Sequence, residues 1–312
     1  MVACALWAQA AAAQFPARPL RFVVPQAPGS ATDNIARLVT PELAKQLGQA
    51  VVVDNRPGGA LTIGIDAVAK SPPDGYTLGM GPVGALAITR HMVAKLPYDI
   101  ERDLQPVALI TTGYMLLAVS PKIQINSVIE LIDYAKKNPG KLSNASSSNG
   151  SPGHVSGELF KTMTGTDIVH VPYKGGAAAI ADLIAGNVEL MFESTNSIAP
   201  HVKAGRVRAL AVTGARRAAS LPEVPTLTES GVPGYEVTAW TGVIAPAGLA
   251  RPVLERLNAA VNAAILEPQV KARLAQLGSE GGGGTPEDYA ALIRRDSAKW
   301  AEVVRRSGAK ID

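Results

Sequence analysis

The sequence has one cysteine, few aromatic residues and little charge of either sign. Cys4 is the only cysteine among 312 residues, and aromatic residues make up 4% of the chain. Beyond Cys4 the chain therefore cannot form a disulfide, a cysteine–zinc site or a thiolate nucleophile. The formal charge of +4 is spread along the sequence without a Lys/Arg block. Nothing in this pattern indicates binding to nucleic acid.

Long hydrophobic runs are also absent after the first residues. No later stretch approaches the roughly 18 uninterrupted apolar residues of a membrane-spanning helix. The chain begins MVACALWAQAAAAQ, which is apolar and ends in an A-x-A-type cleavage pattern at Ala11–Ala13. We interpret residues 1–13 as the rear of a secretory signal peptide and expect a soluble, exported mature protein. A disordered alanine-rich N-terminus is the alternative.

The common catalytic signatures are missing as well. In GSPG, residues 150–153, the serine directly follows the glycine, so this is not a G-x-S-x-G nucleophile elbow. His154 and Glu158 form H-x-x-x-E and not the zinc motif H-E-x-x-H, and no phosphate-binding or dinucleotide glycine loop occurs. We therefore expect no enzyme, no cofactor and no metal site. A serine hydrolase that uses Ser151 or Ser148 with His154 remains the catalytic alternative.

Short β-branched runs alternate with amphipathic stretches along the chain. The helix predicted over Thr32–Leu47 has apolar residues near a period of 3.6, and Gly48 follows it. Such alternation predicts an α/β fold with parallel sheets and crossover helices. The predicted strands are Leu20–Val24, Val51–Asn55, Thr77–Met80, Val107–Ile110, Leu116–Val119, Leu142–Ala145, Ile168–Pro172, Val188–Phe192, Arg208–Val212 and Val237–Ile244.

The middle of the chain repeats a tight β-α-β unit, with helices predicted over Ala177–Ala185 and Ser197–Lys203. Residues 252–308 are predicted to be mostly helical, interrupted by the glycine run Gly281–Gly284. Prolines and loop residues gather near 111–121 and 233–247, which we interpret as two passages of the chain between domains. Domain 1 would then comprise residues 14–115 and 236–312, and domain 2 residues 116–235. A cleft between two such domains is a usual place for a small-molecule site.

Residues 24–37, VPQAPGSATDNIAR, lead from a strand through a loop into a helix. Ser30 is placed to cap the helix, with Asp33 three residues later, and Gly29 permits a sharp turn. The first N–H groups of a helix lack partners and lie at the positive end of its dipole, so this loop can bind an anion without a charged side chain. A capped helix with no ligand is the alternative.

A second loop of this kind occurs at residues 145–160, ASSSNGSPGHVSGELF, with Ser151 as the expected cap and Pro152 in the first helical position. We expect His154 to support this helix start or to pack against it, and His170 to be a core histidine. The two loops, one per domain, could close on one anion from opposite sides. A third loop, Gly79–Gly84, would form a wall of the same cleft.

These segments resemble one known family along nearly the whole chain, from about Phe15 to Asp312. PQAPGSATDNIAR, VVVDNRPGG, SPPDGYTL, NPGKLSNASSSNGSPGHVSGELF, VHVPYKGG and PTLTESGVPGYEVTAWTGVIAPAG are similar to the Bug, or TctC-like, receptors of tripartite tricarboxylate transporters. The resemblance implies a type-II-like periplasmic binding protein, with two α/β domains around a ligand cleft. It also implies a small carboxylate ligand, such as a dicarboxylate, an amino acid or an aromatic acid.

In that family, backbone N–H groups and waters from two helix-start loops hold a ligand carboxylate. The resemblance carries this role to Ala27, Pro28, Gly29, Ser30, Ala31, Thr32 and Asp33, and to Ser147, Ser148, Asn149, Gly150, Ser151 and His154, with Gly81 and Pro82 beside them. Pro28 has no N–H and can only shape its loop. Specificity is expected from Gln26, Tyr173, Lys174, Glu193, Thr195, Asn196 and Trp240.

Four departures from the family pattern concern the site. Gln26 replaces a usual phenylalanine, Ser30 replaces a frequent second glycine, Glu193 replaces a frequent aspartate, and residues 79–84 lack the usual Ser/Thr. Glu193 could repel a second ligand carboxylate or pair with an ammonium group. Lys174 could meet a distal carboxylate or be solvated, and Trp240 could line the cleft or fill the interdomain core.

The resemblance further implies a periplasmic monomer that docks on membrane permease subunits and has no nucleic-acid partner. A carboxylate sensor for a membrane kinase is the alternative role for the same receptor, and the sequence does not separate the two.

Overall fold

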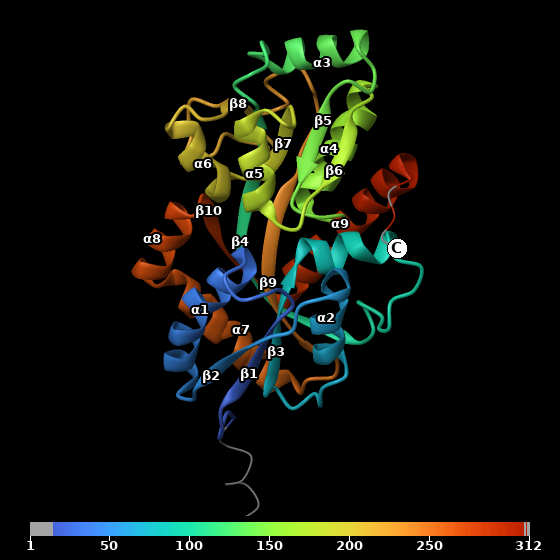
Figure 1. The fold of residues 1–312 in the computed structure, drawn as a ribbon. Helices are drawn as coiled ribbons and strands as arrows, with labels where there is room; N and C mark the ends of the chain where they lie inside the picture. The colour runs from blue at the N-terminus through green and yellow to red at the C-terminus, as the bar shows by residue number, and fades with distance from the viewer. Residues whose placement is uncertain (1–14, 309, 311–312) are drawn as a thin grey trace, which may run out of the picture.

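The fold consists of two α/β halves joined by two long strands, as Figure 1 shows. The structure, a computed structural model, describes residues 15–308 and Lys310. The predicted signal segment, with Ala11–Ala13 and Cys4, lies outside these residues. Among the described helices, none combines the length and the apolar character needed to cross a membrane.

The first half is built on parallel strands that begin near the N-terminus. β1 lies between β2 and β3 and pairs in parallel with both. The elements of this half are β1 (Leu20–Val24), α1 (Ala31–Leu47), β2 (Val51–Asn55), η2 (Gly59–Leu61), α2 (Thr62–Ala69), β3 (Thr77–Pro82), η3 (Gly84–Ile88), η4 (Thr89–His91), α7 (Arg251–Leu266) and α8 (Pro268–Gln276). Helix α1 packs against α7 on the same side of the sheet.

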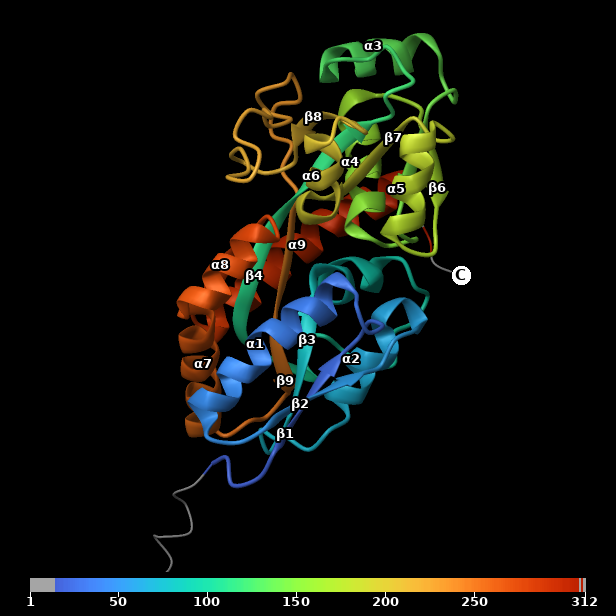
Figure 2. The same ribbon diagram turned by 60° about the vertical axis from the view of Figure 1, so that its left-hand side comes forward.

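The second half repeats the arrangement with the middle of the chain. β5 lies between β6 and β7 and pairs in parallel with both. Its elements are α3 (Val128–Lys137), β5 (Ser143–Ser146), α4 (Pro152–Thr164), β6 (Val169–Pro172), α5 (Gly176–Ala185), β7 (Leu190–Ser194), α6 (Thr195–Lys203) and β8 (Arg208–Val212). Figure 2 shows these elements gathered at one end of the molecule.

Strand β4 (Leu104–Val119) belongs to both halves. Its first part pairs antiparallel with β9 (Thr238–Pro246), from Leu104 opposite Pro246 to Tyr114 opposite Thr238. Its last residues, Met115–Val119, pair with β7 and β8 of the second half. The short strand β10 (Ser279–Gly283) adds to the other edge of β4. One continuous strand therefore links the two sheets.

Helix α9 (Pro286–Ser307) also connects the two halves. It begins in a capping box, in which the Thr285 side chain accepts from the Asp288 N–H and the Asp288 side chain accepts from the Thr285 N–H. The helix packs against η3 in the first half and α4 in the second, and Figure 2 shows it lying between them. The Trp240 indole N–H donates to Asp296 at 2.6 Å, which fixes α9 on β9.

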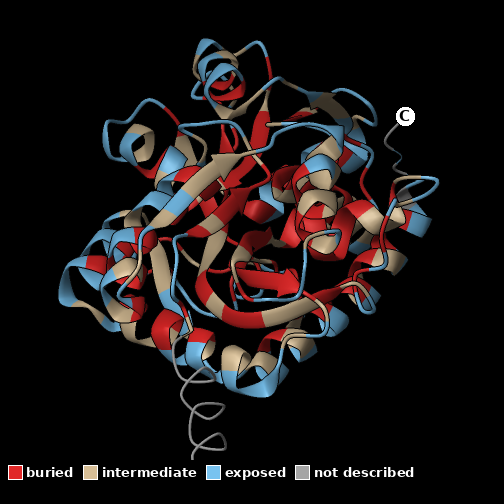
Figure 3. Ribbon diagram, turned by 90° about the horizontal axis from the view of Figure 1, so that it is seen from below, coloured by how far each residue is buried: buried red, intermediate tan, exposed pale blue. Residues whose placement is uncertain are grey.

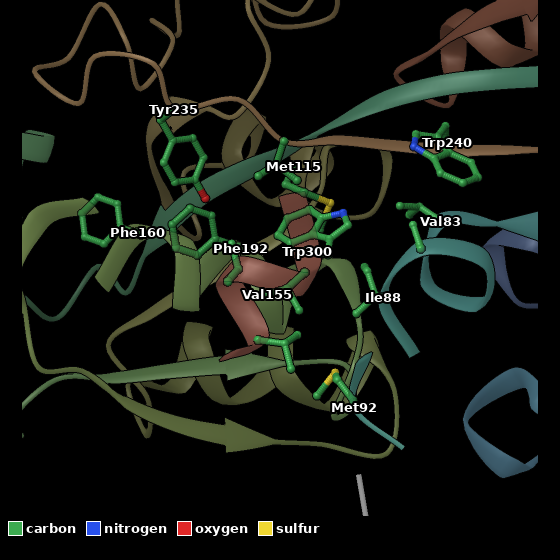
Figure 4. Packing of buried hydrophobic residues seen from close by; sticks show 14 of the residues in the cluster. Val83, Ile88, Met92, Met115, Val155, Phe160, Phe192, Tyr235, Trp240 and Trp300 are labelled. Carbon is green, nitrogen blue, oxygen red and sulfur yellow. The ribbon is translucent and has the colours of Figure 1, made fainter. Parts of the chain in front are cut away.

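Buried residues lie in the sheets and on the inner faces of the helices, and exposed residues lie on the outer faces (Figure 3). One core cluster extends through both halves and includes Val83, Phe160, Trp240 and Trp300 (Figure 4). Within it the ring of Phe192 lies 5.8 Å from that of Phe160 and 6.3 Å from that of Tyr235. Two further clusters fill the separate halves.

The α/β class and the alternation of elements are confirmed, but several sequence predictions were wrong in detail. The sheets are mixed and not simply parallel, because β4 and β9 run antiparallel to their neighbours. The strands predicted at Val107–Ile110 and Leu116–Val119 are both parts of β4. Residues 79–82 of the expected third loop continue β3, and η3 begins at Gly84. The glycine run contributes to β10, because backbone pairing with β4 needs no side chain.

We expect Phe192→Ala to lower the free energy of unfolding by about 3–5 kcal/mol, because it leaves a cavity between two fully buried rings. Chemical denaturation of the two proteins measures this difference. Met163→Ala on α4 is the control, since Met163 is 39% exposed and should change stability by less than about 0.5 kcal/mol. A loss below about 1 kcal/mol for Phe192→Ala would contradict this account of the core.

Candidate ligand-binding site

A cavity of about 210 Å³ lies between the two halves, where helices α1, α4 and α6 begin. Its walls include Ala31 and Thr32 at the start of α1 and Pro152 and Gly153 at the start of α4. The strands β4 and β9 supply another wall through Thr111, Gly113, Tyr114, Met115, Ala239, Trp240 and Thr241. Backbone from both halves thus surrounds one small space.

Helix α1 begins with a Gly-Ser pair. Gly29 has a left-handed φ of 81°, a conformation that glycine adopts without steric cost, and it turns the chain into the helix. The Ser30 hydroxyl accepts from the Asp33 N–H at 3.2 Å, and the Asp33 carboxylate accepts from the Gly29 N–H at 2.8 Å. Ala31 and Thr32 line the cavity, and their N–H groups have no partner within the helix.

Asp33 is buried and held by neighbouring side chains. Its carboxylate accepts hydrogen bonds from Arg37 and from Asn55, each at 2.9 Å. Burial by itself would raise the pKa of the Asp33 carboxyl, but the bonds from Arg37, Asn55 and the Gly29 N–H outweigh burial and lower it. The carboxylate therefore stays ionised and keeps the loop closed over the helix start.

Helix α4 begins with the same arrangement of glycine, serine cap and supporting side chain as α1. Gly150 has a left-handed φ of 72°, and the Ser151 hydroxyl accepts from the His154 N–H at 3.3 Å. The His154 Nδ1 accepts from the Gly150 N–H at 3.1 Å, as Asp33 does from Gly29. In both loops the side chain of the third helical residue accepts a hydrogen bond from the N–H of the glycine four positions earlier. The prediction that His154 supports the helix start is confirmed.

His154 is stacked on His170, with ring centroids 3.7 Å apart and planes 8° apart. The Nε2 of His170 lies 2.7 Å from the Ser146 hydroxyl, and the His170 side chain is half-buried, so it is not the core residue expected from sequence. Burial, together with the nearby His170 and Lys161, lowers the pKa of His154 to about 3. Burial and Lys161 lower the pKa of His170 to about 4. Both rings are therefore neutral near pH 7.

Glu193 is the charged side chain that lines this cavity. It is the second-last residue of β7, two residues before α6 begins, and is 8% exposed. Its Oε1 accepts from the Ser194 N–H at 2.8 Å and from the Ser194 hydroxyl at 3.0 Å. Burial raises the pKa of Glu193, and the two Ser194 bonds oppose that shift. The chain offers Glu193 no ion pair within the described residues.

A second cavity, of about 730 Å³, continues from the first toward α5 and α6. Both cavities are lined by Gln26, Ala31, Ser147, Glu193 and Ser194, which we call the waist. Beyond the waist the wall becomes apolar at Ile180 and Ile184 and basic at Arg206.

The sequence-predicted site residues fall into two groups in the structure. Those on a cavity wall are Gln26, Ser30, Ala31, Thr32, Pro82, Ser147, Ser148, Glu193, Thr195, Asn196 and Trp240. Those on neither wall are Ala27, Pro28, Gly29, Asp33, Gly81, Asn149, Gly150, Ser151, His154, Tyr173 and Lys174. In the second group, Asp33, Ser151 and His154 hold the loops, and the Tyr173 hydroxyl donates to Asp182.

Apart from Trp240, sequence reasoning did not select the cavity residues of β4 and β9, or Leu277, Gly278 and Ser279 after α8. The passages near 111–121 and 233–247 were the available signal, since they contain the residues of both strands that reach the cavity. Trp240 both lines the cavity and belongs to the central core, so the two interpretations of this residue describe one position. Within residues 15–308, no three His, Cys, Asp or Glu side chains gather as metal ligands would.

Comparison with known proteins identifies the family. Residues 35–309 match TctC, described as the tripartite tricarboxylate transporter family receptor. The chain belongs to this family of periplasmic solute-binding receptors. The protein BugT of Bordetella pertussis is 37% identical over 298 residues, which cover 95% of this chain and 91% of BugT.

Solved structures of relatives show the same two-domain fold. Rpa4515 of R. palustris, whose structure is described with adipate, is 39% identical, has a TM-score of 0.86 and matches 96% of this chain and 100% of its own. MatC of Rhodopseudomonas palustris, described with bound malate, is 34% identical, has a TM-score of 0.83 and matches 93% of this chain and 100% of its own. This TctC-family chain therefore has the architecture of a two-domain periplasmic binding protein, as the sequence predicted.

The stacked histidines predict acid sensitivity in this TctC-family chain. The pKa of His154 is lowered in the folded protein, so its stabilising contribution is present above the unfolded value of 6.5 and is lost as pH falls toward about 3. Between pH 6.5 and pH 5 the loss should reach about 2 kcal/mol. Urea unfolding of the wild type and His154→Gln across this range measures it. The variant should lose less stability than the wild type, and parallel pH profiles would contradict the assignment.

Proposed function

We propose that this protein captures a small carboxylate in the periplasm by closure of its two halves and delivers it to a tripartite tricarboxylate transporter permease. The observation that carries the proposal is the meeting of two helix starts, from opposite halves, at one cavity. Ala31, Thr32 and Gly153 line this cavity, and their N–H groups have no partner within their helices. Such groups favour an anion through hydrogen bonds and the helix dipole together.

The ligand class is supported by relatives as well as by geometry. Rpa4515 and MatC are described with adipate and malate, which are both carboxylates. The proposed site residues are those predicted from the sequence that line the cavities, with the β4 and β9 residues added. Gly29, Asp33, Gly150 and His154 shape the loops in this proposal and leave the helix N–H groups available.

Closure would change the angle between the two halves. We assign residues 14–115 and 236–312 to one domain and 116–235 to the other, so that β4 and β9 form the crossings. Because α9 packs on both halves, it would move with one half and slide against the other.

The protein would act as a monomer without a cofactor. Signalling to a membrane kinase remains the alternative use of the same capture step.

The serine hydrolase alternative finds no support in the geometry. The Ser151 hydroxyl accepts from the His154 backbone N–H, and the His154 Nδ1 accepts from Gly150. Among the described residues, neither Ser148 nor Ser151 has a hydroxyl hydrogen bond to the His154 ring. A nucleophile paired with its base would need such a bond.

A thermal-shift panel tests the proposed function. Binding to the native state must raise the melting temperature, so at least one small carboxylate in a panel of mono- and dicarboxylates, amino acids and aromatic acids should raise it. Neutral amides of the same acids are the control and should leave it unchanged. A melting temperature that no carboxylate raises would contradict the proposal.

Ala31→Pro tests the backbone contact itself. Proline is well tolerated as the first helical residue, and Ser30 already has the extended φ of −67° and ψ of 163° that precede proline. The variant removes one N–H from the cavity wall, so the affinity for the carboxylate found in the panel should fall by about 10-fold or more. Titration calorimetry measures the change. Ala31→Gly keeps the N–H and is the control; equal affinities of the two variants would refute the contact.

A further inference from the structure

Glu193 presents an unused hydrogen-bond acceptor to the waist of the two cavities. Its Oε1 accepts both bonds from Ser194, and its Oε2 accepts none from the described residues. Oε2 lies against the first residue of α5, because a Cβ built on Gly176 would lie 2.9 Å from it. Glu193 is 8% exposed as a residue, so Oε2 has only limited access to water from the cavities.

Gln26 adds a second acceptor without a donor. Its Oε1 is buried and has no hydrogen-bond partner, and Gln26 lines both cavities as Glu193 does. Buried acceptors are normally paired, and each unpaired one disfavours the empty state. The buried Gln26 oxygen and the Glu193 oxygen that has no protein donor therefore favour a ligand that carries several N–H donors at the waist.

Glu193 also occupies the place that a second ligand anion would take. It lies at the starts of α5 and α6, since it contacts Gly176 and precedes the α6 cap residue Ser194. Helix starts bind one negative charge favourably, but a second carboxylate beside Glu193 would meet like charge in a poorly solvated space. The chain itself has thus filled this anion position.

We propose that Glu193, assisted by Gln26, is a specificity-determining residue that selects an ammonium group on the ligand and excludes a second carboxylate. The ligand is then a zwitterion, with a carboxylate at the starts of α1 and α4 and an ammonium group at the waist. This inference rests on the proposed function, because it takes the carboxylate position from it. An ammonium group has three donors and no acceptor, which suits two acceptor oxygens, one of them charged.

Matched ligand pairs test the inference directly. Succinate is paired with 4-aminobutanoate and adipate with 6-aminohexanoate, so that within a pair the chain length is kept and only the far end changes. Butanoate and hexanoate, which end in methyl groups, complete the two series. Titration calorimetry at pH 7.5 gives the affinity of each compound for the wild type, Glu193→Gln, Glu193→Asp and the control Glu255→Gln, whose glutamate is exposed on α7.

The wild type should bind the amino acid of at least one pair about 10-fold or more tighter than its dicarboxylate and its methyl-ended partner. Glu193→Gln should remove or reverse this preference, Glu193→Asp should keep its sign, and Glu255→Gln should leave every ratio unchanged. The melting temperature of unliganded Glu193→Gln should equal or exceed that of the wild type at pH 7.5, because the variant lacks the unpaired charge. This measurement also shows that the variant is folded.

Three results would overturn the inference. The first is a dicarboxylate that binds the wild type as tightly as its amino partner, and the second is an unchanged ratio in Glu193→Gln. The third is a wild type that binds carboxylates of the thermal-shift panel but none of these amino acids. In all three cases the proposed function would survive. Failure of every carboxylate in that panel would instead overturn the proposed function and this inference with it.

Discussion

The pairing of β4 with β9 is the constraint on which the site depends. β4 pairs with β9 over Leu104–Tyr114 and then continues into the second sheet over Met115–Val119. Because one strand serves both sheets, the parallel strands of the two halves extend from it toward a common space. In parallel sheets the helices start beyond the carboxyl ends of the strands, so α1 after β1 and α4 after β5 both begin at the cavity.

Helix starts therefore dominate the electrostatics of the cavity. α1, α4 and α6 begin on the wall of the smaller cavity, and Gly176 brings the start of α5 to the larger one. Each start contributes partial positive charge through N–H groups with no partner in the helix. This explains how a chain without a lysine or arginine on the wall of the smaller cavity can attract an anion, and why a buried glutamate at the waist is tolerated.

Local sequence patterns were sufficient for the helix starts and insufficient for the strands between the halves. Ser30 with Asp33, and Ser151 with Pro152, are signals within one turn of helix, and the structure contains both caps. The wall formed by Thr111 and Thr241 depends on pairing between residues far apart in sequence, which no local pattern encodes. Likewise the bonds from Arg37 and Asn55 to Asp33 follow from tertiary packing. The two-domain division was inferred from the prolines and loop residues near 111–121 and 233–247, and the family resemblance agreed with it.

The loops at the starts of α1 and α4 pair a glycine N–H with different side chains, a carboxylate in one and an imidazole in the other. A loop at a helix start has more free N–H groups than one ligand carboxylate can accept, and any left buried and unpaired is unfavourable. Asp33 accepts from the Gly29 N–H and His154 accepts from the Gly150 N–H, so these two loop donors are paired, while Ala31, Thr32 and Gly153 at the helix starts line the cavity. Neither group places a free negative charge beside the ligand, because Arg37 pairs with Asp33 and burial keeps His154 neutral. Glu193 has no such partner, so it is the residue that the proposed ligand ammonium group would pair with.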